Sequence, residues 1–180
     1  MSMRNPRALA ALLALGSIAA VATGAEGPGL GVPVSPEKIA AADISIAPDG
    51  RGRPAGSGNA VAGEKVYLAR CIACHGEKGQ DGPNDRLVGG HGSLATDSPV
   101  KTVGSFWPYA TTVFDYVRRA MPYTEPRTLT DADTYAVTAY LLFLNGIIGQ
   151  KDVMNATTLP KVKMPNRDGF VWTSDAPPPR

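Results

Sequence analysis

The chain has 180 residues, of which 43% are hydrophobic, with 18 lysines and arginines against 16 aspartates and glutamates. This length suits one domain with extensions, since domains typically run to about 100–200 residues. The 20 glycines and 16 prolines predict long irregular stretches. A charge so close to neutral gives no sign of a nucleic acid or an anionic membrane surface as partner.

Residues 1–25 have the pattern of a signal peptide. Arg4 and Arg7 form a short basic region, and the apolar run after them is shorter than the roughly 20 residues of a membrane span. Small residues follow, which suits cleavage after Gly24 or Ala25. We therefore expect a periplasmic protein with no stable membrane insertion after cleavage; an uncleaved membrane anchor is the alternative.

Residues 26–58 form a Gly/Pro-rich arm with little room for regular structure. We expect the first part, 26–36, to be a flexible tether. In the second part Ile44 and Ile46 alternate like a short extended segment. We expect residues 43–58 to pack on the domain that follows, by burying these two side chains.

A first helix is predicted over residues 60–73. Asn59 is a favourable N-cap, and only Gly63 interrupts the run. A glycine inside a helix costs about 1 kcal/mol relative to alanine, so it commonly has a packing reason. Gly63 and Tyr67 share a face, where a small residue beside an aromatic one would let another helix cross closely. A merely tolerated glycine is the alternative.

Cys71, Cys74 and His75 follow as a CxxCH motif that contains both cysteines of the chain. The spacing is typical of c-type haem attachment, in which two thiols bond to one porphyrin and the adjacent imidazole ligates the iron. A zinc site would need further ligands, and a thioredoxin-type redox pair would need a βαβ setting. We therefore expect one covalent haem c, with His75 as a ligand of its iron.

Residues 76–108 are too rich in Gly, Asp, Asn, Ser and Pro for a long helix. The Gly82-Pro83 pair places a carbonyl that could accept the Nδ1–H of His75, which would make Nε2 the iron ligand. An ordinary turn at Pro83 is the alternative. Leu87 could then pack on the porphyrin face.

Two further features of this loop bear on the site. His91 is the only other histidine; it could be a second axial ligand, but a solvent-exposed loop histidine is the expected outcome. Trp107 belongs to an aromatic cluster at 106–109 that we expect to wall the haem pocket. Core packing explains this cluster nearly as well.

A second helix is predicted over residues 110–121, ended by Pro122. Its apolar residues recur at i, i+3, i+4 and i+7, the stripe of an amphipathic helix. This stripe consists of Val113, Tyr116, Val117 and Ala120.

Met121 stands at the end of this helix, where its thioether can face the iron from the side opposite His75. Methionine–histidine ligation raises the reduction potential and suits electron transfer. Met154 and Met164 are the competing candidates, but both lie in the tail and neither follows an amphipathic helix. We therefore expect His75 and Met121 as the two axial ligands.

A third helix is predicted over residues 129–146, with Thr130 as its N-cap. It is apolar nearly all round, which predicts burial on more than one side. Tyr140 is expected to cross the face that carries Gly63 and Tyr67. The segment after this helix has no periodicity and should form an extended tail.

The order of these motifs resembles the class I cytochromes c over residues 59–148. The resemblance implies an all-α protein in which three main helices surround one covalent haem. We expect a signal peptide (1–25), a Gly/Pro-rich arm (26–58), the haem domain (59–148) and an extended C-terminal tail (149–180), the arm and tail both being irregular.

Longer strings are similar to the cytochrome subunits of bacterial sulfur-compound dehydrogenases. These subunits are the c-type partners of molybdenum sulfite dehydrogenases and of the sulfur dehydrogenase in the thiosulfate-oxidising system. The thiosulfate-system subunit is larger and carries two haems, whereas this chain has one CxxCH, which favours the sulfite type. The matching strings are PDGRGRPAGSG (48–58), VGSFWPYATTVFDYVRRAMPY (103–123), AYLLFLNGI (139–147) and LPKVKMPNRDGF (159–170).

The resemblance implies a periplasmic electron-transfer protein that is not an enzyme by itself. It would accept electrons from a molybdenum-cofactor dehydrogenase that oxidises sulfite and pass them to another cytochrome or an oxidase. The arm and the tail are the expected partner surface, since a haem domain does not need them to fold. A free soluble shuttle and a haem enzyme or sensor with a displaceable sixth ligand are the alternatives.

Overall fold

The computed structural model describes residue 27 and residues 29–171. The predicted signal peptide and the end of the tail lie outside these residues. Within them the strands are only two residues long, so the fold is essentially helical, as predicted. The elements are α1 (Pro36–Ala42), β1 (Ser57–Gly58), α2 (Ala60–Arg70), α3 (Ile72–His75), η1 (Ser93–Ala95), α4 (Ala110–Ala120), α5 (Asp131–Leu144), β2 (Met154–Asn155) and η2 (Leu159–Lys161).

Helix α2 begins at the predicted N-cap, where the Asn59 side chain accepts a hydrogen bond from the Ala62 N–H at 3.0 Å. The single helix expected over 60–73 is divided at Cys71, whose φ of −123° and ψ of −30° end α2. The short helix α3 continues directly and carries the rest of the CxxCH motif to His75. The division turns the motif relative to the axis of α2.

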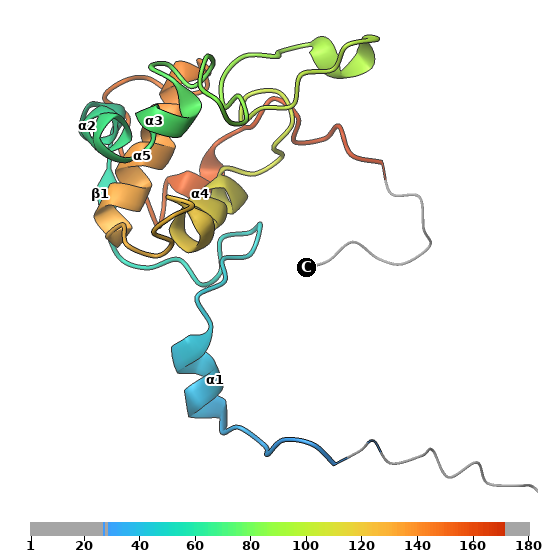
Figure 1. The fold of residues 1–180 in the computed structure, drawn as a ribbon, viewed down its shortest axis with the longest axis vertical. Coiled ribbons are helices and arrows are strands. Elements are labelled where there is room, and N and C mark those ends of the chain that lie inside the picture. Colours follow the sequence, from blue (N-terminus) through green and yellow to red (C-terminus); the bar gives the residue numbers. More distant parts are fainter. Residues whose placement is uncertain (1–26, 28, 172–180) are drawn as a thin grey trace, which may run out of the picture.

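The predicted close crossing of helices exists between α2 and α5, which lie side by side in Figure 1. A Cβ atom on Gly63 would stand 1.9 Å from the carbonyl oxygen of Ala136, so only glycine fits here. The rings of Tyr67 and Tyr140 meet at the same crossing, with centroids 5.3 Å apart. The packing reason predicted for Gly63 is therefore confirmed.

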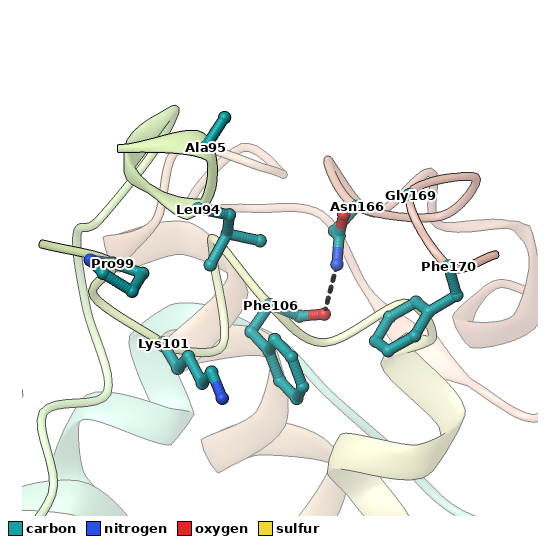
Figure 2. Close-up of a pocket in the computed structure, with 8 residues that line it drawn as sticks. All are labelled: Leu94, Ala95, Pro99, Lys101, Phe106, Asn166, Gly169 and Phe170. Atoms are coloured by element: carbon teal, nitrogen blue, oxygen red, sulfur yellow. Dashed lines mark hydrogen bonds between the residues drawn. The ribbon is translucent and has the colours of Figure 1, made fainter. Parts of the chain in front are cut away.

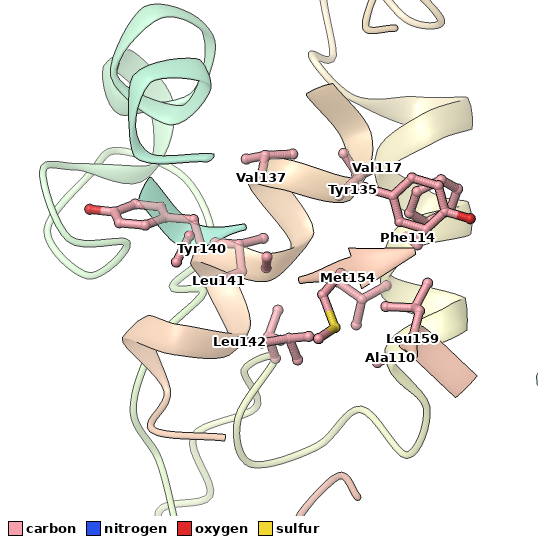
Figure 3. Close-up of a cluster of buried hydrophobic side chains, with 14 of the residues drawn as sticks. Ala110, Phe114, Val117, Tyr135, Val137, Tyr140, Leu141, Leu142, Met154 and Leu159 are labelled. Carbon is pink, nitrogen blue, oxygen red and sulfur yellow. The ribbon is translucent and has the colours of Figure 1, made fainter. Parts of the chain in front are cut away.

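The hydrophobic core surrounds α5, whose residues from Thr134 to Leu142 are all buried (Figure 3). On the side of α4, the ring of Phe114 packs on Tyr135 with centroids 4.3 Å apart. The stripe predicted for α4 is wrong at Tyr116, which is half exposed while Phe114 is buried. The buried face is instead centred on Phe114, because this face of α4 meets α5.

The second part of the arm packs on the domain as predicted, although Ile44 is only half-buried. Ile46 is only 4% exposed, and its N–H donates to Asp115 Oδ1 of α4 at 2.9 Å. Farther along, β1 pairs antiparallel with β2, so the end of the arm and the tail hold one another beside α5. Before Ile44 the described arm is exposed, and α1 stands apart from the helical body (Figure 1).

No helix in the described ranges, 27 and 29–171, combines the length and apolar character that crossing a membrane requires.

Candidate functional site

The CxxCH motif lies at the junction of α2 and α3. Cys71, the C-cap residue of α2, is half-buried, whereas Cys74, one turn later, is exposed. Burial raises the pKa of the Cys71 thiol to about 11. Redox-active CxxC pairs have a lowered thiol pKa, so this environment does not favour the thioredoxin-type alternative.

The ring of His75 is oriented by a backbone carbonyl. His75 Nδ1 lies 2.8 Å from the carbonyl oxygen of Asp85. A carbonyl oxygen can only accept, so Nδ1 carries the proton and Nε2 keeps a free lone pair for a metal. The predicted acceptor at Gly82-Pro83 is wrong in position, because Gly82 lies against the backbone of the motif and the carbonyl of Asp85, three residues later, reaches the ring. Pro83 itself is exposed.

Gly82 has a different task from the one predicted. A Cβ atom at this residue would stand 2.2 Å from the Cys74 carbonyl oxygen and 2.5 Å from the Gly76 nitrogen. The loop therefore folds back directly against the backbone of the motif, and the Asn84 N–H donates to the Cys74 carbonyl at 3.0 Å. This close approach is what brings Asp85 to His75.

Leu87, predicted to pack on the porphyrin, is half-buried against the core. Its carbonyl accepts a hydrogen bond from Asn145 Nδ2 at 3.2 Å, and Asn145 Oδ1 accepts from the Gly89 N–H at 3.1 Å. The same Asn145 amide donates to the Leu141 carbonyl at 2.8 Å. The buried amide thus joins the end of α5 to the loop on both sides of Val88.

Replacing Asn145 by alanine should lower the free energy of unfolding by about 1–3 kcal/mol, because the Gly89 N–H loses its partner and the Leu87 and Leu141 carbonyls each lose one of two hydrogen bonds. Urea unfolding of the holoprotein measures this change. Asn84→Ala, at an exposed residue of the same loop, is the control and should cost less than about 0.5 kcal/mol. Equal losses in the two variants would contradict the assignment.

Met121 is the C-cap of α4 and remains half-buried, with its N–H bonded to the Val117 carbonyl at 3.1 Å. The competing Met154 and Met164 are only 4% and 3% exposed in the hydrophobic core. Figure 3 shows Met154 pointing among the core side chains of α5. Of these three, Met121 has the thioether least enclosed by protein.

One residue of the aromatic cluster before α4 packs on that helix. Trp107 is half-buried and contacts Tyr116 edge to face, with ring centroids 5.7 Å apart. This contact explains why Tyr116 leaves the core face of α4. His91, by contrast, is exposed on its loop.

The chemistry of this donor set fits a covalently attached haem. Two thiols one turn apart, an oriented imidazole and an accessible thioether supply what attachment and axial ligation require. Four apolar side chains that the sequence places near these residues or in the predicted haem pocket pack against the core yet keep part of their surface uncovered, as contact with a flat apolar group would need. These side chains are Ile72, Leu87, Trp107 and Leu129.

A separate open pocket of about 400 Å³ lies where the tail crosses the loop before α4 (Figure 2). Its two polar side chains are already engaged: Asn166 Nδ2 donates to the Phe106 carbonyl at 2.8 Å, and Lys101 lies over the Phe106 ring. The pocket shares no residue with the site above. It is lined by Leu94, Ala95, Pro99, Lys101, Phe106, Asn166, Gly169 and Phe170.

Within the part of the chain that the structure describes, no three His, Cys, Asp or Glu side chains gather to hold a metal ion.

Comparison with protein families matches residues 60–145 to the cytochrome c family. A chain in the crystal structure of the sulfane dehydrogenase SoxCD from Paracoccus pantotrophus is 42% identical, with a TM-score of 0.73. The match covers 82% of this chain and 73% of that chain. This chain belongs to the class I c-type cytochromes.

The cytochrome is related to sulfur-compound dehydrogenases, as its longer strings predicted. Its three main helices and few strands agree with the class I fold. Comparison with curated proteins found no match.

Sequence reasoning missed three groups in this cytochrome: the Asp85 carbonyl, the Asn145 amide and the Tyr67 hydroxyl. The Asp85 acceptor belongs to the backbone and has no side-chain signature. Asn145 was recognisable only as a residue at the end of a helix. Tyr67 was expected for its ring, and nothing in the spacing indicated that its hydroxyl reaches Gly76.

Proposed function

We propose that this cytochrome is the electron-accepting subunit of a periplasmic sulfur-compound dehydrogenase. The observation that carries the proposal is the haem-attachment motif, with an oriented His75, in a chain 42% identical to one from the SoxCD sulfane dehydrogenase. The cytochrome by itself is an electron carrier and no enzyme.

Each residue of the site has a task in this proposal. Cys71 and Cys74 would hold one haem c through thioether bonds, and His75 and Met121 would ligate its iron. Asp85 fixes the imidazole through Nδ1. The haem, when bound, supplies an iron that changes its oxidation state by one electron. With His75 and Met121 both ligating the iron, the protein would leave no position there for a substrate.

The electron donor in this proposal is a molybdenum-cofactor dehydrogenase, and the acceptor is a downstream cytochrome or an oxidase. Sulfite is the substrate that we propose for the donor, since this chain has one CxxCH motif. A sulfane substrate is the second candidate, favoured by the SoxCD similarity. Purified complex assayed with sulfite and with sulfane sulfur as separate substrates distinguishes the two.

The two alternative functions, a haem enzyme or sensor and a free electron shuttle, require different properties of the protein. A haem enzyme or sensor would need the sixth axial position open, so it requires that Met121 not ligate the iron. A free shuttle would need no lasting contact with a dehydrogenase. Purification from native periplasmic extract separates the shuttle from the subunit: co-elution of the haem with a molybdenum-containing polypeptide at a fixed ratio supports the subunit, and elution of the cytochrome alone refutes it.

The arm is the surface through which we propose that the dehydrogenase subunit is held. Residues 27–36 contain no charged side chain, and Leu30, Val32 and Val34 alternate along them with 55–87% of their surface exposed. Helix α1 has seven residues, none of them buried. A helix this short is marginal in water, so an apolar partner surface would stabilise it. In addition, the net charge of residues 26–180 is zero, which argues against a purely electrostatic contact.

Changing Leu30, Val32 and Val34 together to serine should weaken binding of the dehydrogenase subunit by more than tenfold. Burying such side chains contributes about 1.5–3 kcal/mol each, and each 1.4 kcal/mol is tenfold in affinity. The dissociation constant of the reconstituted complex measures the effect. The control changes Val61 and Leu68, exposed apolar residues of the haem domain, to serine; losses as large in the control would refute a specific role of the arm.

A further inference from the structure

Tyr67 contacts the haem-attachment motif on both sides. Its carbonyl accepts a hydrogen bond from the Cys71 N–H at 2.8 Å, and its hydroxyl donates to the Gly76 carbonyl at 2.8 Å. The first contact is made by the first residue of the motif, and the second is made by the residue directly after His75. Burial raises the pKa of Tyr67 to about 12, so the hydroxyl keeps its proton and remains a donor.

The Gly76 carbonyl is the start of the loop that orients His75. Gly76 has a φ of 77°, which turns the chain out of α3. The Gly79 N–H returns to the Gly76 carbonyl at 3.4 Å, and the Leu87 N–H donates to the Gly79 carbonyl at 2.7 Å. Asp85 lies within this loop, so the position of its carbonyl depends on the position of the Gly76 peptide, where the loop begins.

Tyr67 is itself held firmly. The side chain is completely buried, and its ring packs against Tyr140 at the crossing of α2 and α5. In the described part of the chain, its hydroxyl is the only group of another residue's side chain that hydrogen-bonds to the backbone of residues 71–76. A rigid helix crossing is thus connected through one hydroxyl to the peptide next to His75.

We propose that Tyr67 is a positioning residue for the haem ligand, acting through its hydroxyl. The Tyr67–Gly76 hydrogen bond holds the loop closed and so keeps the Asp85 carbonyl at His75 Nδ1. A firm hydrogen bond at Nδ1 makes the imidazole a more basic ligand. A more basic ligand favours the ferric over the ferrous state, so Tyr67 would shift the redox balance through the loop and His75.

The test is Tyr67→Phe in the haem-loaded full chain, which keeps the ring and removes only the hydroxyl. Loss of one hydrogen bond corresponds to a factor of about 2–10 in an equilibrium. At a fixed ambient potential, the ferrous-to-ferric ratio should rise by this factor. The proton on His75 Nδ1, followed by NMR in the ferrous protein, should exchange with solvent faster by a similar factor.

Tyr140→Phe is the matched control, because it removes a hydroxyl from the other ring of the same crossing. Its redox ratio and Nδ1 exchange should match those of the unmodified protein. If Tyr67→Phe only lowers the free energy of unfolding and leaves both readouts unchanged, the hydroxyl is structural and the proposal is overturned. Equal shifts in the two variants would overturn it as well. The experiment needs no dehydrogenase, so its outcome is independent of the proposed partner.

Discussion

Replacing Met121 by alanine should abolish the methionine-to-iron charge-transfer band of the ferric protein and lower the reduction potential. The thioether favours ferrous iron, and water or another ligand in its place does so less. Axial ligands set haem potentials over a range of about 0.8 V, so we expect a fall by a substantial part of that range. Redox titration monitored by visible absorption measures both changes in one experiment.

Met154→Ala and Met164→Ala are the controls for this prediction, since both side chains lie in the core. Each should keep the charge-transfer band and lose about 2–5 kcal/mol of stability instead. If the band survives in Met121→Ala and disappears in one of the core variants, the axial assignment is wrong. If the unmodified protein shows no such band, the sixth coordination position of the iron is open or holds a different ligand, as in a haem enzyme or sensor.

Replacing Gly63 by valine should prevent α2 and α5 from packing as they do. The new Cβ would stand 1.9 Å from the Ala136 carbonyl and 2.8 Å from the Tyr140 Cβ, so a helix must move. Overpacking of a core costs about 1–3 kcal/mol or more, and contact with backbone atoms places this variant at the upper end. We expect a loss of at least about 3 kcal/mol in guanidinium unfolding, with little haem-loaded protein recovered.

Ala62→Val is the control on the adjacent, exposed position of the same helix. This substitution should lower the free energy of unfolding only by the difference in helix propensity between alanine and valine, which is below about 0.7 kcal/mol. An unfolding free energy for Gly63→Val within 1 kcal/mol of the control would show that the crossing can open without penalty. Gly63 would then be a tolerated glycine, the alternative reading of the sequence.

The features that sequence reasoning predicted well are those determined by local chemistry. Asn59 and Thr130 cap their helices with the expected side-chain hydrogen bonds, to Ala62 and Asp133. Burial all round the third helix followed directly from its composition. The crossing at Gly63 was also predictable, because an interrupted helix needs a packing reason.

The features that escaped prediction depend on the path of irregular backbone. Whether Gly82 or Asp85 presents a carbonyl to His75 is decided by how the loop lies against Cys74, and side-chain patterns carry no such information. The prediction that Tyr116 is buried failed for a related reason. Its spacing suits the core stripe, but its ring contacts Trp107 of the preceding loop, outside the core. Periodicity describes one helix at a time and cannot include such neighbours.

The pairing of β1 with β2 bears on the order in which the domain is completed. Residues 57–58 and 154–155 flank both the attachment motif and Met121 in the sequence. Chains are synthesised from the N-terminus, so the motif and Met121 are both made before β2. The topology therefore lets the two strands pair only after both proposed ligands of the iron are present in the chain.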